Sequence, residues 1–260
     1  MFYSGGMAFS PHRPVSFSRF MQLLATRHSP ALLWYSAPGE RIELSGRVLE
    51  NWVAKSANFL MDECELDVAA RLAVPLRLHW RSLVLALAGL QVGAHLTWEQ
   101  AESADVRASF DPRELLESAG ENYRVAVASE PLAPRFMGQL PEGVLDFAAE
   151  VRSHPDAFMG LTGPDSGATA WGGTGYEQLM IEVAQQAEKL VTALPDDTAA
   201  VHCAGEVFSA QWLQQALTAL AAGLAVLVLD PEVSWETGRY ARVMADERAQ
   251  PYPAPERRPQ

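Results

Sequence analysis

Apolar segments of strand-like length alternate with helical patterns along most of this 260-residue chain. Four of these segments are LAVPL at 72–76, AHLTW at 94–98, YRVAVAS at 123–129 and LAVLVLD at 224–230. A strand that is buried on both faces has such a continuous apolar run, and strands that alternate with helices form parallel sheets. The alternation therefore predicts an α/β fold in which mainly parallel sheets are flanked by helices.

The same patterns give expected bounds for each element. Helices are expected at 16–26, 45–61, 81–92, 112–119, 144–152, 176–193, 210–222 and 234–247. Strands are expected at 31–36, 41–44, 72–76, 94–98, 123–129, 157–161, 198–204 and 224–230. Residues 1–13 and the Pro-rich tail at 250–260 lack such patterns, and we expect both to be disordered.

Two helical segments resemble each other and indicate two similar lobes. LVLALAGLQVG at 83–93 and LQQALTALAAG at 213–223 share apolar positions, and both end in a glycine that precedes an expected strand. We expect Gly93 and Gly223 to end these helices in the left-handed conformation. We place the lobes at about 14–130 and 131–249. The alternative is convergence, because any helix packed on a sheet has such a face.

Composition excludes several classes of function. A net charge of −12 argues against nucleic-acid binding and against docking on an anionic membrane, since both need clustered Lys and Arg. The longest apolar stretch, 216–229, is shorter than the roughly 20 residues of a spanning helix. Two cysteines far apart in sequence suit a reducing compartment, and no His pair has metal-ligand spacing. We therefore expect a cytoplasmic protein without a metal site.

A glycine-rich segment, LTGPDSGATAWGGTGYEQLM at 161–180, follows an expected strand and leads into an expected helix. Such loops hold phosphate with bare backbone N–H groups at a helix N-terminus. The candidate phosphate-binding residues are Thr162, Gly163, Ser166, Gly167, Thr169, Gly172, Gly173 and Thr174. However, the segment has no Lys or Arg and matches no standard phosphate-loop pattern. The alternative is a plain flexible loop, mobile between Gly163 and Gly175.

No catalytic constellation emerges from the residues alone. Ser166 lacks the flanking glycines of a nucleophile elbow. His202 and Cys203 are neighbours on an expected strand, so their side chains point to opposite faces. We therefore predict no catalytic residue and no bound cofactor.

Three segments resemble the N-terminal part of the adenylate-forming superfamily, which includes acyl-CoA synthetases, peptide-synthetase adenylation domains and luciferases. PALLWYSAPGERIELSGRVLENWVAKSANFL at 30–60 is similar to the opening hairpin and helix of that family. RLAVPLRLHWRSLVLALAGLQVGAHLTW at 71–98 is similar to its next unit, and 198–230 to the corresponding unit of its second lobe. The resemblance covers about 16–247 and is nearest to short, uncharacterised relatives of these enzymes. It implies the two-lobed α/β fold of their N-terminal subdomains.

The family motifs are altered at the positions that carry chemistry. The signature loop of the family, T-S-G-T-T-G-x-P-K-G, binds ATP phosphates, and TGPDSGATAW at 162–171 is similar to it. Thr162 and Gly167 match, whereas Ala170 takes the lysine position and Trp171 the last glycine. In a second motif the aromatic residue is kept as Phe208, and Ser209 replaces the histidine. The later metal, ribose and catalytic-lysine motifs have no counterpart in the 260 residues.

Three hypotheses follow from this resemblance. The first is a truncated, non-catalytic relative, or pseudoenzyme, that binds a small molecule or a protein partner. The second is the N-terminal half of a split acyl-adenylating enzyme or acyl-CoA ligase. The third is a homodimeric interaction scaffold, in which the helix at 234–247 covers part of an exposed sheet edge through Tyr240, Val243 and Met244.

Overall fold

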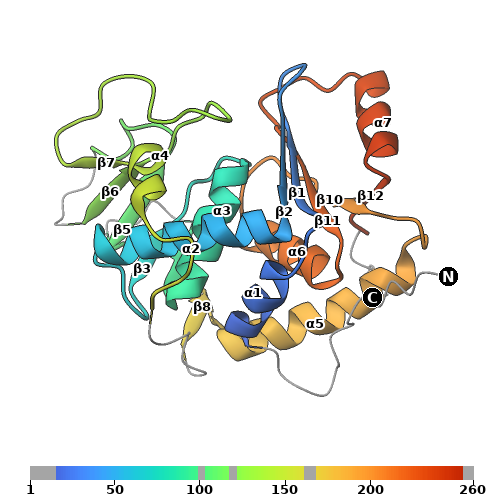
Figure 1. The fold of residues 1–260 in the computed structure, drawn as a ribbon, viewed down its shortest axis with the longest axis horizontal. Helices are drawn as coiled ribbons and strands as arrows, with labels where there is room; N and C mark the ends of the chain where they lie inside the picture. The colour runs from blue at the N-terminus through green and yellow to red at the C-terminus, as the bar shows by residue number, and fades with distance from the viewer. Residues whose placement is uncertain (1–15, 99–102, 117–121, 161–167, 254–260) are drawn as a thin grey trace, which may run out of the picture.

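A computed structural model describes residues 16–98, 103–116, 122–160 and 168–253. Two β-sheets lie on opposite sides of the molecule, and helices α2, α3 and α6 lie between them (Figure 1). The mixed α/β architecture with mostly parallel strands confirms the fold class predicted from the sequence. Within the described ranges, no helix is both long and apolar enough to cross a membrane.

The larger sheet has seven strands in the order β7-β6-β5-β3-β4-β8-β9. All neighbours are parallel except the β8–β9 hairpin. Its strands are β3 (Arg71–Ala73), β4 (His95–Thr97), β5 (Val106–Ser109), β6 (Tyr123–Ala126), β7 (Val144–Asp146), β8 (Thr169–Trp171) and β9 (Thr174–Gly175).

The smaller sheet has five strands in the order β12-β10-β11-β1-β2, and only the β1–β2 hairpin is antiparallel. Its strands are β1 (Pro30–Tyr35), β2 (Arg41–Ser45), β10 (Ala200–His202), β11 (Ala225–Leu229) and β12 (Ala249–Pro251). The first hairpin of the chain, β1–β2, thus pairs with β11, which lies near the end of the sequence. The two sheets are therefore not two successive lengths of chain.

The helices are α1 (Phe17–Ala25), α2 (Gly46–Asp62), α3 (Trp80–Val92), α4 (Phe147–Glu150), α5 (Tyr176–Ala193), α6 (Ala210–Ala221) and α7 (Thr237–Asp246). Ser16 and Ser45 accept hydrogen bonds from the backbone at the starts of α1 and α2, as expected of N-caps. Gly93 and Gly223 have φ of 98° and 78°, which confirms the left-handed helix ends. Because positive φ is strained for residues with a Cβ, glycine is the favoured residue at both positions.

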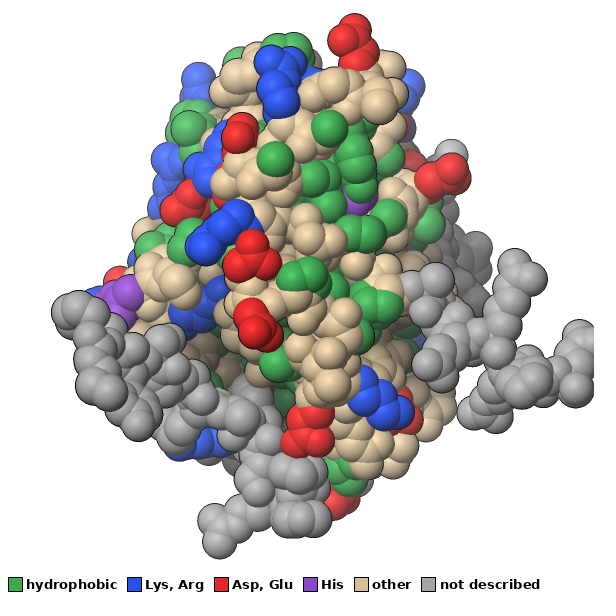
Figure 2. All heavy atoms as spheres, turned by 90° about the vertical axis from the view of Figure 1, so that its right-hand side faces the viewer, with side chains coloured by type: hydrophobic (Ala, Val, Ile, Leu, Met, Phe, Trp, Pro, Cys, Tyr) green, Lys and Arg blue, Asp and Glu red, His purple; other side chains and the backbone are tan. Residues whose placement is uncertain are grey.

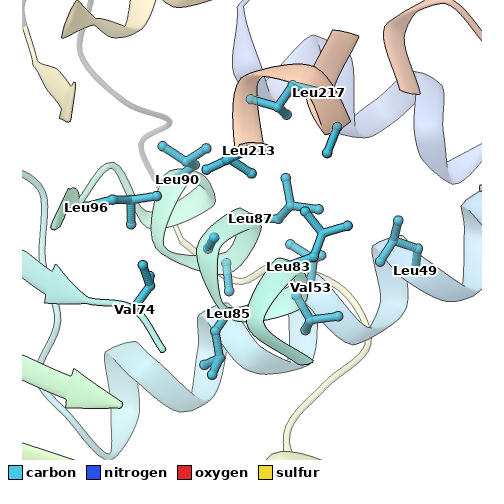
Figure 3. Close-up of a cluster of buried hydrophobic side chains, with 14 of the residues drawn as sticks. Leu49, Val53, Val74, Leu83, Leu85, Leu87, Leu90, Leu96, Leu213 and Leu217 are labelled. Atoms are coloured by element: carbon cyan, nitrogen blue, oxygen red, sulfur yellow. The ribbon is translucent and has the colours of Figure 1, made fainter. Parts of the chain in front are cut away.

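Helix α3 lies at the centre of the main core and is buried around most of its circumference. Figure 3 shows its leucines between α2, α6 and the larger sheet. The labelled side chains of this cluster are Leu49, Val53, Val74, Leu83, Leu85, Leu87, Leu90, Leu96, Leu213 and Leu217. A helix that is apolar on all sides requires partners on all sides, which explains its central position.

Two expected elements are absent from the described residues. Residues 112–116 form successive turns with backbone bonds three residues apart rather than the start of an α-helix, although the Asp111 carboxylate accepts from the Arg113 backbone N–H at 2.9 Å as a cap would. The expected strand at 157–161 is not present in its described part, 157–160. There Asn58 of α2 bonds the Ala157 carbonyl and the Met159 N–H, which would otherwise pair with a strand.

Three further boundaries differ from expectation. The helix expected at 144–152 is replaced by strand β7, the short helix α4 and a 3-10 turn at Val151–Ser153. Asp146 determines this, because its carboxylate accepts from the N–H groups of Ala148 and Ala149 and so caps a helix that begins at Phe147. Strand β5 was not expected. The tail at 250–260 was expected to be disordered, but its first residues belong to strand β12 and the segment after it. The N–H of Tyr252 there bonds to the His202 carbonyl.

Helix α7 covers the outer face of the smaller sheet. Tyr240, Val243 and Met244 pack against apolar residues of that face, which confirms the expected inward side of the helix. Beside it, β12 is the edge strand of the sheet. Because the Tyr252 N–H faces β10, the alternation of a strand places Pro251 and Pro253 outward. Proline has no N–H to donate, so this edge is a poor template for a further strand.

Candidate functional site

The glycine-rich segment contains a β-hairpin at the edge of the larger sheet. Thr162, Gly163, Ser166 and Gly167 lie outside the described residues. Thr169, Gly172, Gly173 and Thr174 lie in or between β8 and β9, and Gly172 has φ of 51° at the turn. Residues 169–175 are therefore a paired hairpin and not the open flexible loop that we expected.

The two glycines at the hairpin turn leave open space. A Cβ added to Gly172 or Gly173 would meet no atom within 4 Å. Bare backbone at an exposed turn is accessible to a ligand, as the phosphate-loop hypothesis requires. The assignment of Thr169, Gly172, Gly173 and Thr174 to phosphate binding stays a prediction.

Side chains of strand β8 point into the core. Ala170, at the lysine position of the family motif, is 0% exposed and belongs to the main core. Trp171 is also buried, and its ring packs edge-on against Trp98 with centroids 5.8 Å apart. Ala170, which the sequence resemblance aligns with the family's lysine, therefore packs among apolar side chains.

Aromatic side chains that follow strands of both sheets pack together, with Trp98 directly after β4 and Phe208 after β10. Phe208 is fully buried, stacks near Trp98 at 6.5 Å and packs against Trp212 at 5.2 Å. Its N–H donates at 2.6 Å to the carbonyl of Leu76, in the segment that follows β3. Ser209, at the histidine position of the motif, accepts from the Trp212 N–H at 3.2 Å and caps α6. Phe208 thus contributes to the packing of the core, and Ser209 contributes the N-cap of a helix.

A buried polar group at the carboxyl end of β11 was not predicted from the sequence. Asp230 directly follows β11 and is buried, and its carboxylate accepts from the Ser36 hydroxyl at 2.8 Å. It also pairs with Arg77 at 3.2 Å, and Arg77 reaches Glu232 at 2.9 Å. Arg77 follows β3 of the larger sheet, so this ion pair joins the two sheets. The sequence signal was an acidic residue at the carboxyl end of a buried strand, where α/β folds place ligand-binding residues.

His79 is buried beside this group and packs between the rings of Trp34 and Phe110, at 4.8 and 5.0 Å. Burial, followed by the charges of Arg81 and Arg77, lowers the pKa of His79 well below its usual value. The neutral ring accepts from the Arg81 N–H through Nδ1 at 3.1 Å and so caps α3. These contacts indicate a structural role for His79.

The two cysteines are buried and form no disulfide with each other. Complete burial raises the pKa of the Cys203 thiol, and burial raises the pKa of the Cys64 thiol to about 12. Neither is therefore a thiolate near neutral pH. The His202 ring lies on the opposite face of its strand, where Nδ1 is 3.3 Å from the Tyr240 hydroxyl. The predicted separation of His202 and Cys203 is confirmed.

Comparison with solved structures identifies the class of the fold as the N-terminal part of adenylate-forming ligases. An acyl-CoA synthetase of Brucella canis matches 92% of this chain with a TM-score of 0.70 and 15% identity, over 47% of its own length. An acetoacetyl-CoA synthetase of Streptomyces lividans matches 83% of this chain with a TM-score of 0.63 and 17% identity, over 38% of its length. This chain thus spans under half of each enzyme, and the resemblance inferred from the sequence is confirmed for the fold.

Among curated sequences, the chain is similar to a Mycobacterium tuberculosis protein described as a "TIGR03089 family protein". The two are 33% identical over 165 residues, which are 61% of this chain and 66% of that relative. No family model matches the sequence.

Proposed function

We propose that this chain is a non-catalytic relative of the adenylate-forming ligases, which binds a small molecule or a protein partner. The buried side chain of Ala170 carries the proposal. Adenylation needs cationic groups on the transferring phosphate, and a lysine at this position would have its ammonium placed among apolar side chains. The aromatic packing around Phe208 supports the same reading, because this motif residue is fully buried and its ring contacts Trp98 and Trp212. The two buried thiols support a cytoplasmic location.

Pyrophosphate exchange tests this proposal. Purified protein, ATP, Mg²⁺ and labelled pyrophosphate are incubated with a panel of carboxylic acids that ranges from acetate to long-chain fatty and aromatic acids. We expect no exchange above a heat-killed control, while an authentic acyl-CoA synthetase exchanges label in parallel. Exchange with any acid in the panel would overturn the non-catalytic assignment.

A split enzyme is the second candidate, and the coverage of the solved ligases favours it. The Brucella canis enzyme has more than half of its length outside the matched region. In this hypothesis, a separate polypeptide that resembles this remainder would contribute the groups that lie there in the solved ligase. Under the split-enzyme hypothesis, we expect pyrophosphate exchange when the two purified chains are mixed and none from either chain alone.

The homodimeric scaffold is the third candidate, and the edge of β12 restricts how it could form. With Pro251 and Pro253 facing outward, a dimer formed at this edge would use side-chain contacts rather than an extended sheet. Light scattering at micromolar concentration would give twice the 28.4 kDa mass of the chain if the scaffold hypothesis holds. A mass of one chain would exclude it.

A further inference from the structure

A cavity of about 440 Å³ lies between α7, β12 and the turn that follows α5. Figure 2 views the side of the molecule that carries α7 and β12. The cavity is lined by Asp197, Thr198, Ala241, Met244, Ala245, Arg248, Ala249 and Gln250. It borders the smaller sheet, whereas the glycine-rich hairpin is at the edge of the larger one. A site here is therefore independent of the proposed function.

Two exposed residues of opposite charge, Asp197 and Arg248, contribute to the lining of this cavity. Among the described residues, the Arg248 guanidinium and the Asp197 carboxylate have no hydrogen-bond or ion-pair partner. The hydroxyl of Thr198 is buried and likewise has no partner in the described part of the chain. A buried hydroxyl normally has a hydrogen-bond partner, so this one has an unmet requirement at the cavity wall.

The backbone of Arg248 adds a second observation. It has φ of 45° and follows the end of α7, a position at which glycine is favoured. Its N–H bonds to the Ala245 carbonyl, and its carbonyl accepts from the Ala199 N–H, so the conformation is fixed from both sides. Arginine in this conformation is strained, and such strain is concentrated at functional sites. A role of the guanidinium at the cavity would explain why arginine rather than glycine occupies this strained position.

We propose that this cavity binds a small zwitterion of the amino-acid class. The carboxylate of the ligand would pair with Arg248, whose planar fork suits a carboxylate. The ammonium would lie against Asp197 and the carboxyl end of α7, where the helix dipole favours a cation. A polar group on the ligand would satisfy the Thr198 hydroxyl, and the methyl groups of Ala241, Ala245 and Ala249 leave room for a short side chain.

Isothermal titration with defined probes tests the site. The probes are L-alanine, L-serine and L-threonine as zwitterions, with propionate and ethylamine as probes of single charge. We expect saturable binding of at least one zwitterion, and binding at least about tenfold weaker for both single-charge probes, since each leaves one charged group unpaired. No saturation by any zwitterion would overturn the proposal, as would equal binding of propionate or ethylamine.

Matched variants locate the binding. Arg248→Gln and Asp197→Asn should each weaken binding of the zwitterion at least about tenfold. Arg242→Gln and Asp196→Asn, which change exposed neighbours outside the lining, should leave it unchanged. Equal losses in both pairs would indicate a general charge effect and contradict the site.

The variant Arg248→Gly separates ligand binding from structure. Glycine relieves the backbone strain, so the melting temperature should rise by about 2–4 °C while zwitterion binding is lost. Retained binding in this more stable protein would show that the guanidinium is not a ligand group.

Discussion

Replacing Arg81 by leucine should lower the free energy of unfolding by about 3–5 kcal/mol, the largest effect that we expect from one substitution. Arg81 is 1% exposed, and its guanidinium donates to the carbonyls of Ala128, Glu130 and Ala133 at 2.6, 2.6 and 3.1 Å. Leucine would leave these carbonyl oxygens without their donor, and those of Ala128 and Ala133 belong to buried residues. The connection between β6 and β7 would lose its main attachment to α3.

Urea unfolding measures this effect, and two variants control for it. Arg113→Leu removes an exposed arginine whose ion pair with Asp111 is on the surface, so we expect little change in the free energy of unfolding. Arg81→Lys keeps the charge but cannot reach several carbonyls at once, so it should recover only part of the stability. If Arg81→Leu unfolds within 1 kcal/mol of the parent protein, the three hydrogen bonds do not hold this connection in solution.

Replacing Asn58 by alanine should cost about 3–4 kcal/mol, because one buried amide makes three hydrogen bonds to a single segment. Asn58 is 2% exposed; Nδ2 donates to the carbonyls of Pro155 and Ala157 at 3.0 and 2.9 Å, and Oδ1 accepts from the Met159 N–H at 3.0 Å. These bonds replace the strand pairing that the sequence predicted for this segment.

Hydrogen exchange distinguishes a local effect from a global one. In Asn58→Ala we expect faster exchange of the Met159 amide and its neighbours while β10 and β11 keep their protection. Asn51→Ala, a half-buried residue on the same helix, should leave the exchange of Met159 unchanged. Unaltered exchange at Met159 in Asn58→Ala would contradict the role of the amide.

The elements that the sequence predicted well are those whose own residues determine them. Helix α3 has an unbroken apolar pattern and a terminal glycine, and both ends were placed within one residue. The prediction of a strand at 157–161 was wrong because a distant residue, and not the segment itself, determines its structure. Its apolar residues fit a strand, but its backbone groups bond to Asn58, which is about 100 residues earlier and gives no local signal.

The candidate site was predictable only where a motif could be compared. The glycine-rich segment was found from its composition, and the loss of its lysine was evident at Ala170. The burial of that side chain required the structure, because it depends on pairing between β8 and β9. The cavity beside α7 was not predictable, since Asp197 and Arg248 line it together only when β12 joins the sheet, and the sequence indicated a disordered tail from residue 250.

The order of strands in the smaller sheet sets a delay during synthesis. Strand β1 pairs with β11, and Ser36 and Asp230 beside that pairing are 194 residues apart in the chain. At translation rates of roughly 5–20 residues per second, the first hairpin emerges about 10–40 s before its neighbour exists. During that interval the apolar residues of β1, including Leu32 and Trp34, have no sheet to join. Until β11 has been synthesised, the apolar surface of β1 therefore lacks its parallel neighbour.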